Sequence, residues 1–351
     1  MTTPLDLALL ERCANDPKGP VALHMATELL PVEGRGQPFF PATFAMESKY
    51  NIDELADGTR VALVDSVGSQ ANRMEPLFLE EEYADLVPQV TIRYGDPKKG
   101  TDGQVSLLEA GHRVGDAVLR CTSLAASAHE AFVAAGKGDC GPMARLGPTS
   151  LVFGAWDSRD TGVKLPRIVQ SVIRAWDVSR LSRSAQFVPA LDYQALGVVA
   201  DDQKLEKDKK TKSGLAERGF LHVPSTGDHG GVIATGPIRR NVTVNLIALR
   251  RLQATERAEE MRRYILGLAL IAATAPLDPF LRQGCLLVPD ADRQSEWNAV
   301  SRSGSREAVE VDREGLIAWA RSQAEVWGVA EDQTVDFDEK LAKEDMKKGA
   351  K

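Results

Sequence analysis

Apolar residues recur along the chain in two patterns, which predict where strands and helices lie. Short apolar runs and alternations are typical of strands, whereas apolar residues three or four apart are typical of helices. The predicted strands are 20–32, 60–66, 86–94, 149–158, 168–178, 184–191, 242–249 and 284–290. The predicted helices are 5–14, a helix from Ser69 that Pro76 ends or kinks, 105–122, 124–136, 254–275 and 313–329. This mixture predicts an α+β fold with helices on one face of a sheet.

Three segments lack either pattern. Residues 34–45 contain Gly and Pro at turn-forming spacing, which predicts a loop. Residues 201–218 are highly charged and read as an exposed excursion from the core. Residues 331–351 form a charged C-terminal tail that we expect to be flexible. The remaining chain, 1–330, is then expected to be a single large domain with insertions.

The composition indicates a soluble protein with a substantial core. Apolar residues make up 43% of the chain, yet the longest apolar stretch, 264–277, is too short to span a membrane. The N-terminus carries acidic residues and no basic region, so no secretory signal is expected. The four cysteines are scattered and form no CxxC pair, which favours reduced thiols, a cytoplasmic protein and no cysteine-based zinc site.

The charge is unevenly distributed. The chain as a whole has a formal net charge of −7, which argues against nucleic-acid binding, but residues 145–187 and 231–263 each carry seven bases against three acids. Basic segments inside an acidic protein indicate a local anionic partner. The alternative is that these bases alternate outward from strands and are only solvated.

The motif VDSVGSQANRME, residues 64–75, takes a predicted strand directly into a predicted helix. Ser69 is expected to cap this helix, whose first-turn N–H groups then point outward and favour an anion. Gln70 and Arg73 are three residues apart and share a helix face beside Asn72, and the Arg73 guanidinium suits a phosphate. The alternative is an ordinary capped helix with a surface arginine.

A second motif combines bases with aromatic residues. In the segment WDSRDTGVKLPRIVQSVIRAWDV, residues 156–178, the two tryptophans Trp156 and Trp176 accompany four bases. These bases are Arg159, Lys164, Arg167 and Arg174. Cationic side chains that bind phosphates, together with aromatic rings that stack on nucleobases, suit a single nucleic-acid strand. The alternative is a hairpin whose tryptophans belong to the core.

Histidines provide the remaining candidate chemistry. His112 and Asp116 are four residues apart on the predicted helix 105–122, where a structural hydrogen bond or a phosphate contact from His112 and Arg113 is favoured over catalysis. His222, Asp228 and His229 invite a metal site, but their spacing fits a Gly-rich loop better. The sequence contains no GxxxxGK[ST], GxSxG or HExxH and no convincing nucleophile–base pair, so we expect no catalytic residue, metal or cofactor.

Three long motifs in the same order resemble a known family. LVDSVGSQANRME, EAGHRVGDAVLR and GPTSLVFGAWDSRDTGVKLPRIVQSVIRA are similar to the CRISPR-associated RAMP backbone subunit of the type I-G (formerly I-U) Cascade complex. The resemblance extends over roughly residues 20–290, without the excursion and the tail. It implies a hand-shaped fold, with a ferredoxin-like, RNA-recognition-motif-like palm and large finger and thumb insertions.

The resemblance also implies a function. Copies of such a subunit assemble with other Cascade subunits along a CRISPR guide RNA and present it for pairing with target DNA in antiviral defence. The subunit itself is not a nuclease. Ser69, Gln70 and Arg73 fit the family's guide-binding pattern, although Gly68 replaces a second serine. The expected RNA contacts are Ser69, Gln70, Asn72, Arg73, His112, Arg113, Arg159, Lys164, Arg167, Arg174 and Arg239.

Two other functions stay open at this point. A metal-independent RAMP endoribonuclease would process CRISPR precursor RNA with His24, His112 or His229 as the general acid–base. A metal-dependent hydrolase would use Asp65, Asp228 and His229. The leading expectation remains a non-catalytic RNA-binding scaffold.

Overall fold

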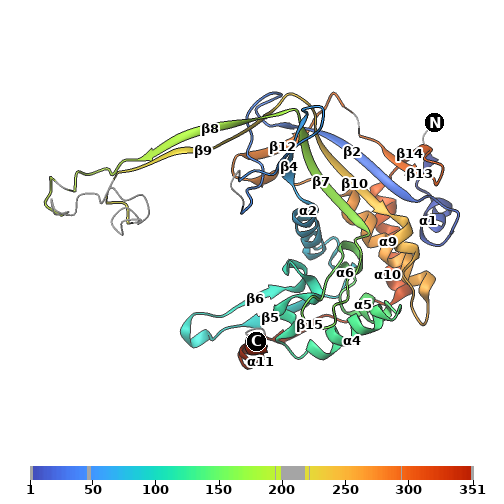
Figure 1. The fold of residues 1–351 in the computed structure, drawn as a ribbon. Helices are drawn as coiled ribbons and strands as arrows, with labels where there is room; N and C mark the ends of the chain where they lie inside the picture. Colours follow the sequence, from blue (N-terminus) through green and yellow to red (C-terminus); the bar gives the residue numbers. More distant parts are fainter. Residues whose placement is uncertain are drawn as a thin grey trace.

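The structure is a computed structural model that describes residues 3–45, 49–193, 195–198, 218–220, 222–293 and 295–348. Most of its strands belong to one large, mainly antiparallel sheet (Figure 1). In spatial order this sheet contains β1 (Thr3–Pro4), β14 (Arg306–Glu310), β13 (Trp297–Val300), β2 (Ala22–Pro31), β10 (Ile238–Asn245), β7 (Val169–Trp176), β4 (Arg60–Asp65) and β3 (Ile52–Glu54). The other end of β2 pairs with β12 (Cys285–Pro289), which also pairs with β11 (Phe280–Arg282).

The centre of this sheet has the ferredoxin-like strand order. Along the chain come β2, then helices, then β7 and β10, then helix α9 (Ala258–Thr274), and then β12 and β13. In space β12 and β13 lie beside β2, β2 beside β10, and β10 beside β7, and all these pairs are antiparallel. This is the β-α-β-β-α-β arrangement of a ferredoxin-like fold, to which β4 and β3 add an edge. The predicted α+β palm is confirmed.

Helices cover one face of this sheet, as the apolar pattern predicts. Helix α2 (Val67–Met74) packs on β7, and α9 packs on β10 and β7. The second half of α9 is buried throughout, because its residues 264–273 carry no charge. Helix α10 (Arg313–Trp327) lies against α9, where the missing side chain of Gly267 allows Ala320 to approach closely. The main core therefore lies between the sheet and these helices.

The opposite face of the sheet carries polar side chains. Because successive side chains of a strand alternate between faces, the buried residues Ser171 and Arg240 face α2, whereas Arg174 and Arg239 point away from it. Arg174 and Arg239 are paired directly across β7 and β10, and both are exposed. The two predicted RNA contacts on these strands therefore lie on the face that α2 does not cover.

A second lobe is built from segments inserted between β4 and β7 together with the C-terminal tail. Its small sheet has the order β15 (Gln333–Asp336), β5 (Val90–Tyr94) and β6 (Gly103–Ser106). Its helices are α3 (Ala117–Arg120), α4 (Ala125–Gly136), α5 (Gly141–Leu146) and α6 (Thr149–Phe153). The predicted flexible tail contains β15 and helix α11 (Glu339–Lys348), and β15 pairs in parallel with β5. Part of this tail is thus tied to the body of the protein.

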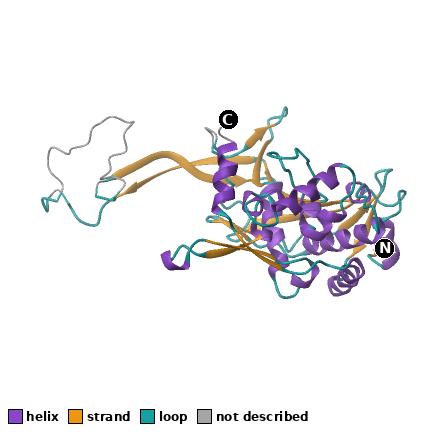
Figure 2. Cartoon of the chain, turned by 90° about the horizontal axis from the view of Figure 1, so that it is seen from below, coloured by secondary structure: helices purple, strands orange, loops and turns teal. Residues whose placement is uncertain are grey.

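A long two-stranded arm leaves the main sheet. It consists of β8 (Val178–Phe187) and β9 (Val223–Ala234), which pair with each other as a two-stranded sheet and project well beyond the body (Figures 1 and 2). Near its far end, Phe187, Val188 and Leu191 are at least half exposed. Residues 184–187 of the predicted strand 184–191 are therefore the end of the longer strand β8, whereas residues 188–191 are not part of a strand. Most of the charged excursion, 201–217, lies outside the described residues.

Two element predictions were wrong, and a third was wrong in part. Of the predicted strand 242–249, only 242–245 belong to β10, because the Asn245 side chain caps helix α8 (Leu246–Arg250). Residues 149–158 form helix α6 and a loop instead of a strand, because a short, fully buried apolar run has no distinguishing period. Residues 105–122 form two short 3-10 turns and the single-turn α3 instead of one helix. Local caps divide this segment: Ser106 and Glu109 form a capping box, and Asp116 caps α3.

Candidate nucleic-acid interface

Helix α2 begins two residues earlier than the sequence predicts. Ser66 is its N-cap, in extended conformation, and the Ser66 hydroxyl accepts a hydrogen bond from the Ser69 backbone N–H at 3.2 Å. The prediction that Ser69 caps the helix was therefore wrong, since Ser66 already satisfies the orphan N–H group. The Ser69 hydroxyl instead donates to Asp65, at 2.9 Å. Gly68 lies in open space, with only the Ser66 hydroxyl near the position of a Cβ.

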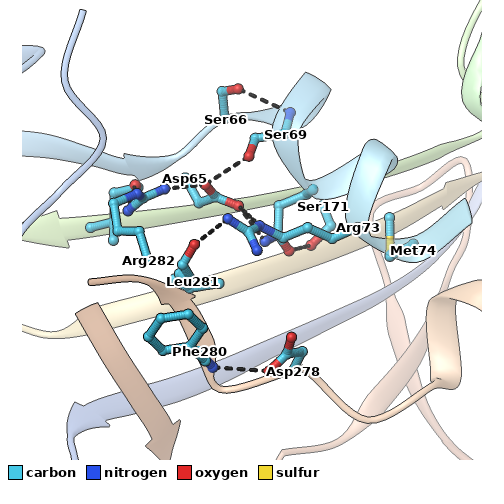
Figure 3. Close-up of polar contacts among 12 residues, drawn as sticks. Asp65, Ser66, Ser69, Arg73, Met74, Ser171, Asp278, Phe280, Leu281 and Arg282 are labelled. Atoms are coloured by element: carbon cyan, nitrogen blue, oxygen red, sulfur yellow. Dashed lines mark hydrogen bonds and ion pairs between the residues drawn. The ribbon is translucent and has the colours of Figure 1, made fainter. Parts of the chain in front are cut away.

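Asp65 is the centre of the polar contacts at the start of α2. A register shift between Leu63 and Asp65 turns this residue inward, where its side chain is fully buried. Its carboxylate accepts hydrogen bonds from Ser69, Gln70, Arg73 and Arg282 (Figure 3). A buried carboxylate is tolerated when its lone pairs are satisfied in this way. The end of β4, the first turns of α2 and β11 are thus held by one side chain.

Gln70 lies in the interior and not on the surface. Its amide nitrogen donates to Asp65 at 2.7 Å, and its amide oxygen accepts from the Ser171 hydroxyl, also at 2.7 Å. Ser171 in turn accepts from Arg240 Nε at 3.1 Å. Gln70 is only 1% exposed. It therefore positions α2 on the sheet, and the surface of α2 is formed by its neighbours.

Arg240 is a buried arginine on the inner face of β10. Burial lowers the pKa of its guanidinium to about 10. Within the described residues its side chain donates to the Ser171 hydroxyl and to the Met74 sulfur, and it forms no ion pair with a carboxylate there. Ile238, Arg240 and Val242 alternate along β10 and share its inner face. This alternation is visible in the sequence and predicts that Arg240 faces inward, although the sequence analysis did not single out Arg240.

Arg73 combines interior contacts with exposure to solvent. Its Nε donates to Asp65 at 3.2 Å, and one of its Nη groups donates to the Leu281 carbonyl. Its side chain is nevertheless 31% exposed. Arg282 is held in the same way by Asp65, at 2.5 Å, and by the Val64 carbonyl, at 2.9 Å. Two cationic groups are thus fixed in place by one carboxylate, with part of each reaching solvent.

Arg113 connects α2 to the chain that follows α6. It is 3% exposed, lies 2.7 Å from Glu75 and donates to the Asn72 side chain at 3.2 Å and to the Gly154 carbonyl at 3.1 Å. Burial raises the pKa of Glu75 to about 7, against the opposing effect of Arg113. Arg113 therefore lies beneath the surface as an internal link, whereas Asn72 is exposed.

The other predicted RNA contacts lie in three places. His112 is exposed, with its Nδ1 3.4 Å from Asp116, and it lies in a turn beside Arg113 instead of on a helix. Arg159, Lys164 and Arg167 are exposed in the loop that precedes β7. Arg174 and Arg239 lie on the outer face of the sheet, where Arg239 forms an ion pair with Glu28 at 3.0 Å. Of the eleven predicted residues, Gln70 and Arg113 are thus buried and Arg174 and Arg239 lie on the outer face of the sheet, whereas the other seven are at least partly exposed on α2, in the turn at His112 and in the loop before β7.

The proposed metal and histidine sites gain no support. His222 contacts Gln186 at 3.1 Å, and the side chains of Asp228 and His229 lie outside the described residues. In the described part of the chain no group of three or more His, Cys, Asp or Glu side chains could hold a metal ion. Desolvation lowers the pKa of the half-buried His24. The four cysteines, Cys13, Cys121, Cys140 and Cys285, are buried and free, and none of the described helices is long and apolar enough to cross a membrane.

Comparison with known proteins finds one family model that is similar to part of the chain. Residues 23–180 match the model of the family described as CRISPR-associated protein GSU0053 (Cas_GSU0053). Over this segment the chain is similar to a CRISPR-associated family. The segment is somewhat less than half of the 351 residues, and it includes α2, the turn at His112 and the loop before β7.

The other comparisons add little. No curated protein matches the sequence. Among solved structures, one match is a chain of "CRISPR RNA-guided surveillance complex, pre-nicking", with 12% identity and a TM-score of 0.38 over 94% of this chain and 99% of the other. A similarity this low carries no conclusion, so the ferredoxin-like assignment rests on the strand order given above.

Proposed function

We propose that this chain is a non-catalytic, guide-RNA-binding subunit of a Cascade-type CRISPR effector complex, of type I-G. Copies of the chain would line up along the guide RNA, with other Cascade subunits, and present it for pairing with target DNA. The observation that carries the proposal is the match of residues 23–180 to a CRISPR-associated family model. The matched residues include all three sequence motifs that resemble RAMP backbone subunits.

The surface of α2 is the best candidate for the RNA contact. We define the α2 surface as Ser69, Asn72, Arg73 and His112, which are partly or fully exposed on α2 and the adjacent turn. Arg73 offers a partly exposed guanidinium whose orientation is fixed by Asp65, and a fixed planar fork suits a phosphate. In Figure 1, α2 lies between the projecting arm and the β5–β6 hairpin. Asn72, Arg73 and His112 are exposed, so a ligand can reach the α2 surface from solvent.

Self-association is the second part of the proposal. The arm formed by β8 and β9 projects from the body and carries exposed apolar residues. They are Phe187, Val188, Leu191, Leu196 and Val198. Several large apolar side chains exposed together favour a contact with another protein surface. A second copy of this chain is the partner that a filament along RNA requires.

A catalytic role has no comparable support. His112 is exposed in the turn beside α2, and its ring contacts Asp116, a hydrogen-bond acceptor that is not the nucleophile in RNA cleavage. We therefore propose no endoribonuclease or hydrolase activity. Incubation of the protein with labelled CRISPR precursor RNA should leave the RNA intact. Discrete cleavage that is lost in His112→Ala would contradict this part of the proposal.

The proposal is tested by expression beside a CRISPR array. Purified protein should carry small RNA of guide sequence, seen as a raised ratio of absorbance at 260 nm to that at 280 nm and by sequencing, and should form oligomers by light scattering. Arg73→Gln should carry less RNA. The matched control is Arg321→Gln, which removes an exposed arginine of α10 and should change nothing. A nucleic-acid-free monomer would contradict the proposal.

A further inference from the structure

Trp156 is a large aromatic side chain that the fold leaves on the surface. It is 56% exposed, although a tryptophan normally buries most of its ring. For Trp156, the alternative of a core tryptophan is therefore wrong. Its backbone pairs with that of Lys164 in an isolated bridge, and Lys164 Nζ lies 5.6 Å from the centre of the ring. One ammonium group is thus placed beside an indole that remains largely open to solvent.

The hairpin that carries Trp156 is held rigidly by its own hydrogen bonds. The buried Asp157 accepts from the Thr161 backbone N–H at 2.9 Å and from the Thr161 hydroxyl at 2.8 Å. Its own N–H donates to the Val163 carbonyl at 3.0 Å. Gly162 turns the chain with φ of 72°, a conformation that favours glycine. The exposure of Trp156 is therefore a fixed feature of the hairpin and does not result from a loose loop.

The charges around Trp156 favour an anionic partner. Arg159, Lys164 and Arg167 are exposed on the same segment. The two acids of the hairpin are already engaged, because Asp157 is buried in the turn and Asp160 contacts His129 at 2.5 Å. Basic side chains without free acidic neighbours, beside an exposed ring, suit a nucleic-acid strand whose phosphates bind the cations and whose nucleobases stack on the ring. A purely apolar protein contact would leave these three cations without partners.

The Trp156 hairpin is continuous with the α2 surface. Arg113 donates both to the Asn72 side chain and to the Gly154 carbonyl, two residues before Trp156. A Cβ on Gly115, in the turn after His112, would come within 3.2 Å of the Trp156 carbonyl oxygen. One buried arginine therefore fixes the hairpin relative to α2.

We propose that Trp156 is a stacking platform for one base of single-stranded RNA, with Lys164 and Arg167 holding the neighbouring phosphates. This inference rests on the proposed function, because it assigns a specific contact within the same RNA interface. It assigns base stacking to Trp156, an uncharged residue that the distribution of basic side chains does not point to. Stacking is tolerant of sequence, since every base has a π-face. The platform therefore suits guides of any sequence.

The test uses the full chain, freed of nucleic acid at high salt, and a fluorescein-labelled oligouridylate as probe. Affinity is measured by fluorescence anisotropy at several salt concentrations. Trp156→Ala and Trp156→Leu should weaken binding by about 5- to 100-fold, the usual loss for one stacked base. Trp156→Phe should bind within about threefold of the wild type, because it keeps an aromatic face. The control Trp319→Phe changes a partly buried tryptophan of α10 and should have no effect.

The salt dependence separates stacking from charge. Trp156→Ala should leave the slope of log affinity against log salt unchanged, whereas Lys164→Ala should reduce it by about 0.7 for one lost phosphate contact. If the wild type binds the RNA and Trp156→Ala and Trp156→Leu bind it with unchanged affinity, the stacking platform is overturned but the proposed function is not. A wild-type chain that binds no RNA would overturn the platform and the proposed function together. Loss of self-association without loss of RNA affinity would assign Trp156 to a protein contact and also overturn the platform.

Discussion

Arg282 donates a hydrogen bond to the buried Asp65 at 2.5 Å, and this contact joins residues that are 217 positions apart in the chain. It fixes β11, near the end of the sheet, to the strand–helix junction at the start of α2. Arg73 reaches the same carboxylate from α2 itself. The orientation of the proposed RNA contact therefore depends on one acidic residue that does not itself face solvent.

Asp65→Asn should destabilise the fold. The substitution keeps the size of the side chain but leaves Arg73 and Arg282 without their shared counter-charge. Breaking a buried pair costs about 3–5 kcal/mol, and we expect the lower end because both arginines are partly exposed. Urea denaturation gives the free energy of unfolding. The matched control is Asp85→Asn, an exposed partner of Arg321, for which about 0–1 kcal/mol is expected. Equal losses in the two variants would contradict the role of Asp65.

Glu75 should make stability depend on pH. Burial raises its pKa from 4.5 to about 7, so the folded state holds a proton that the unfolded state releases between these values. The folded state then binds more protons, and stability falls as pH rises from 4.5 through about 7. The measurement is the difference in unfolding free energy between the wild type and Glu75→Gln across this range. A difference that stays constant with pH would show that Glu75 does not titrate there.

The two faces of the sheet should contribute unequally to RNA binding. Arg73→Gln should weaken binding and reduce the salt slope by about 0.7, because one phosphate contact is lost. Arg174→Gln removes the same charge from the outer face, opposite α2, and should leave both quantities unchanged. Anisotropy titrations at several salt concentrations provide the comparison, and thermal melts check that both variants fold. The reverse ranking would move the interface to the outer face of the sheet.

The arm should control self-association. Phe187→Ser removes half-exposed apolar surface from the far end of β8. We expect the association constant between copies to fall at least about fivefold, as for an interface residue that contributes more than a marginal contact. Light scattering over a concentration series measures this. Val326→Ser is the control, because Val326 is also half exposed but lies on α10. An unchanged association constant for Phe187→Ser would exclude the described part of the arm as the contact.

The sequence predicted the elements whose patterns are long or strongly alternating. Helices α9 and α10 and strands β2, β4 and β7 follow from their residues. The strand prediction for residues 149–158 was wrong because a short buried apolar run fits a strand and a helix equally well. The prediction of one helix over residues 105–122 was wrong because a capping box and a second N-cap interrupt the helical spacing of the apolar residues. The competing signals were local and were present in the sequence.

The candidate site was only partly predictable. The motif at 64–75 correctly marked a strand–helix junction rich in polar contacts, but it did not show that Asp65 and Gln70 face inward. That depends on a register shift in β4 and on Arg282, which approaches from a distant part of the chain. Trp156 likewise could not be separated from a core tryptophan, because its exposure follows from how the hairpin packs. Long-range contacts decide which polar residues remain available at a surface.

The most direct test of RNA binding through the α2 side is ultraviolet crosslinking of the protein–RNA complex, followed by mass spectrometry of the crosslinked peptides. The account predicts crosslinks within residues 66–75, at His112 and within 156–167. Crosslinks confined to the outer face of the sheet, around Arg174 and Arg239, or none at all from a chain that is shown to be folded, would contradict it.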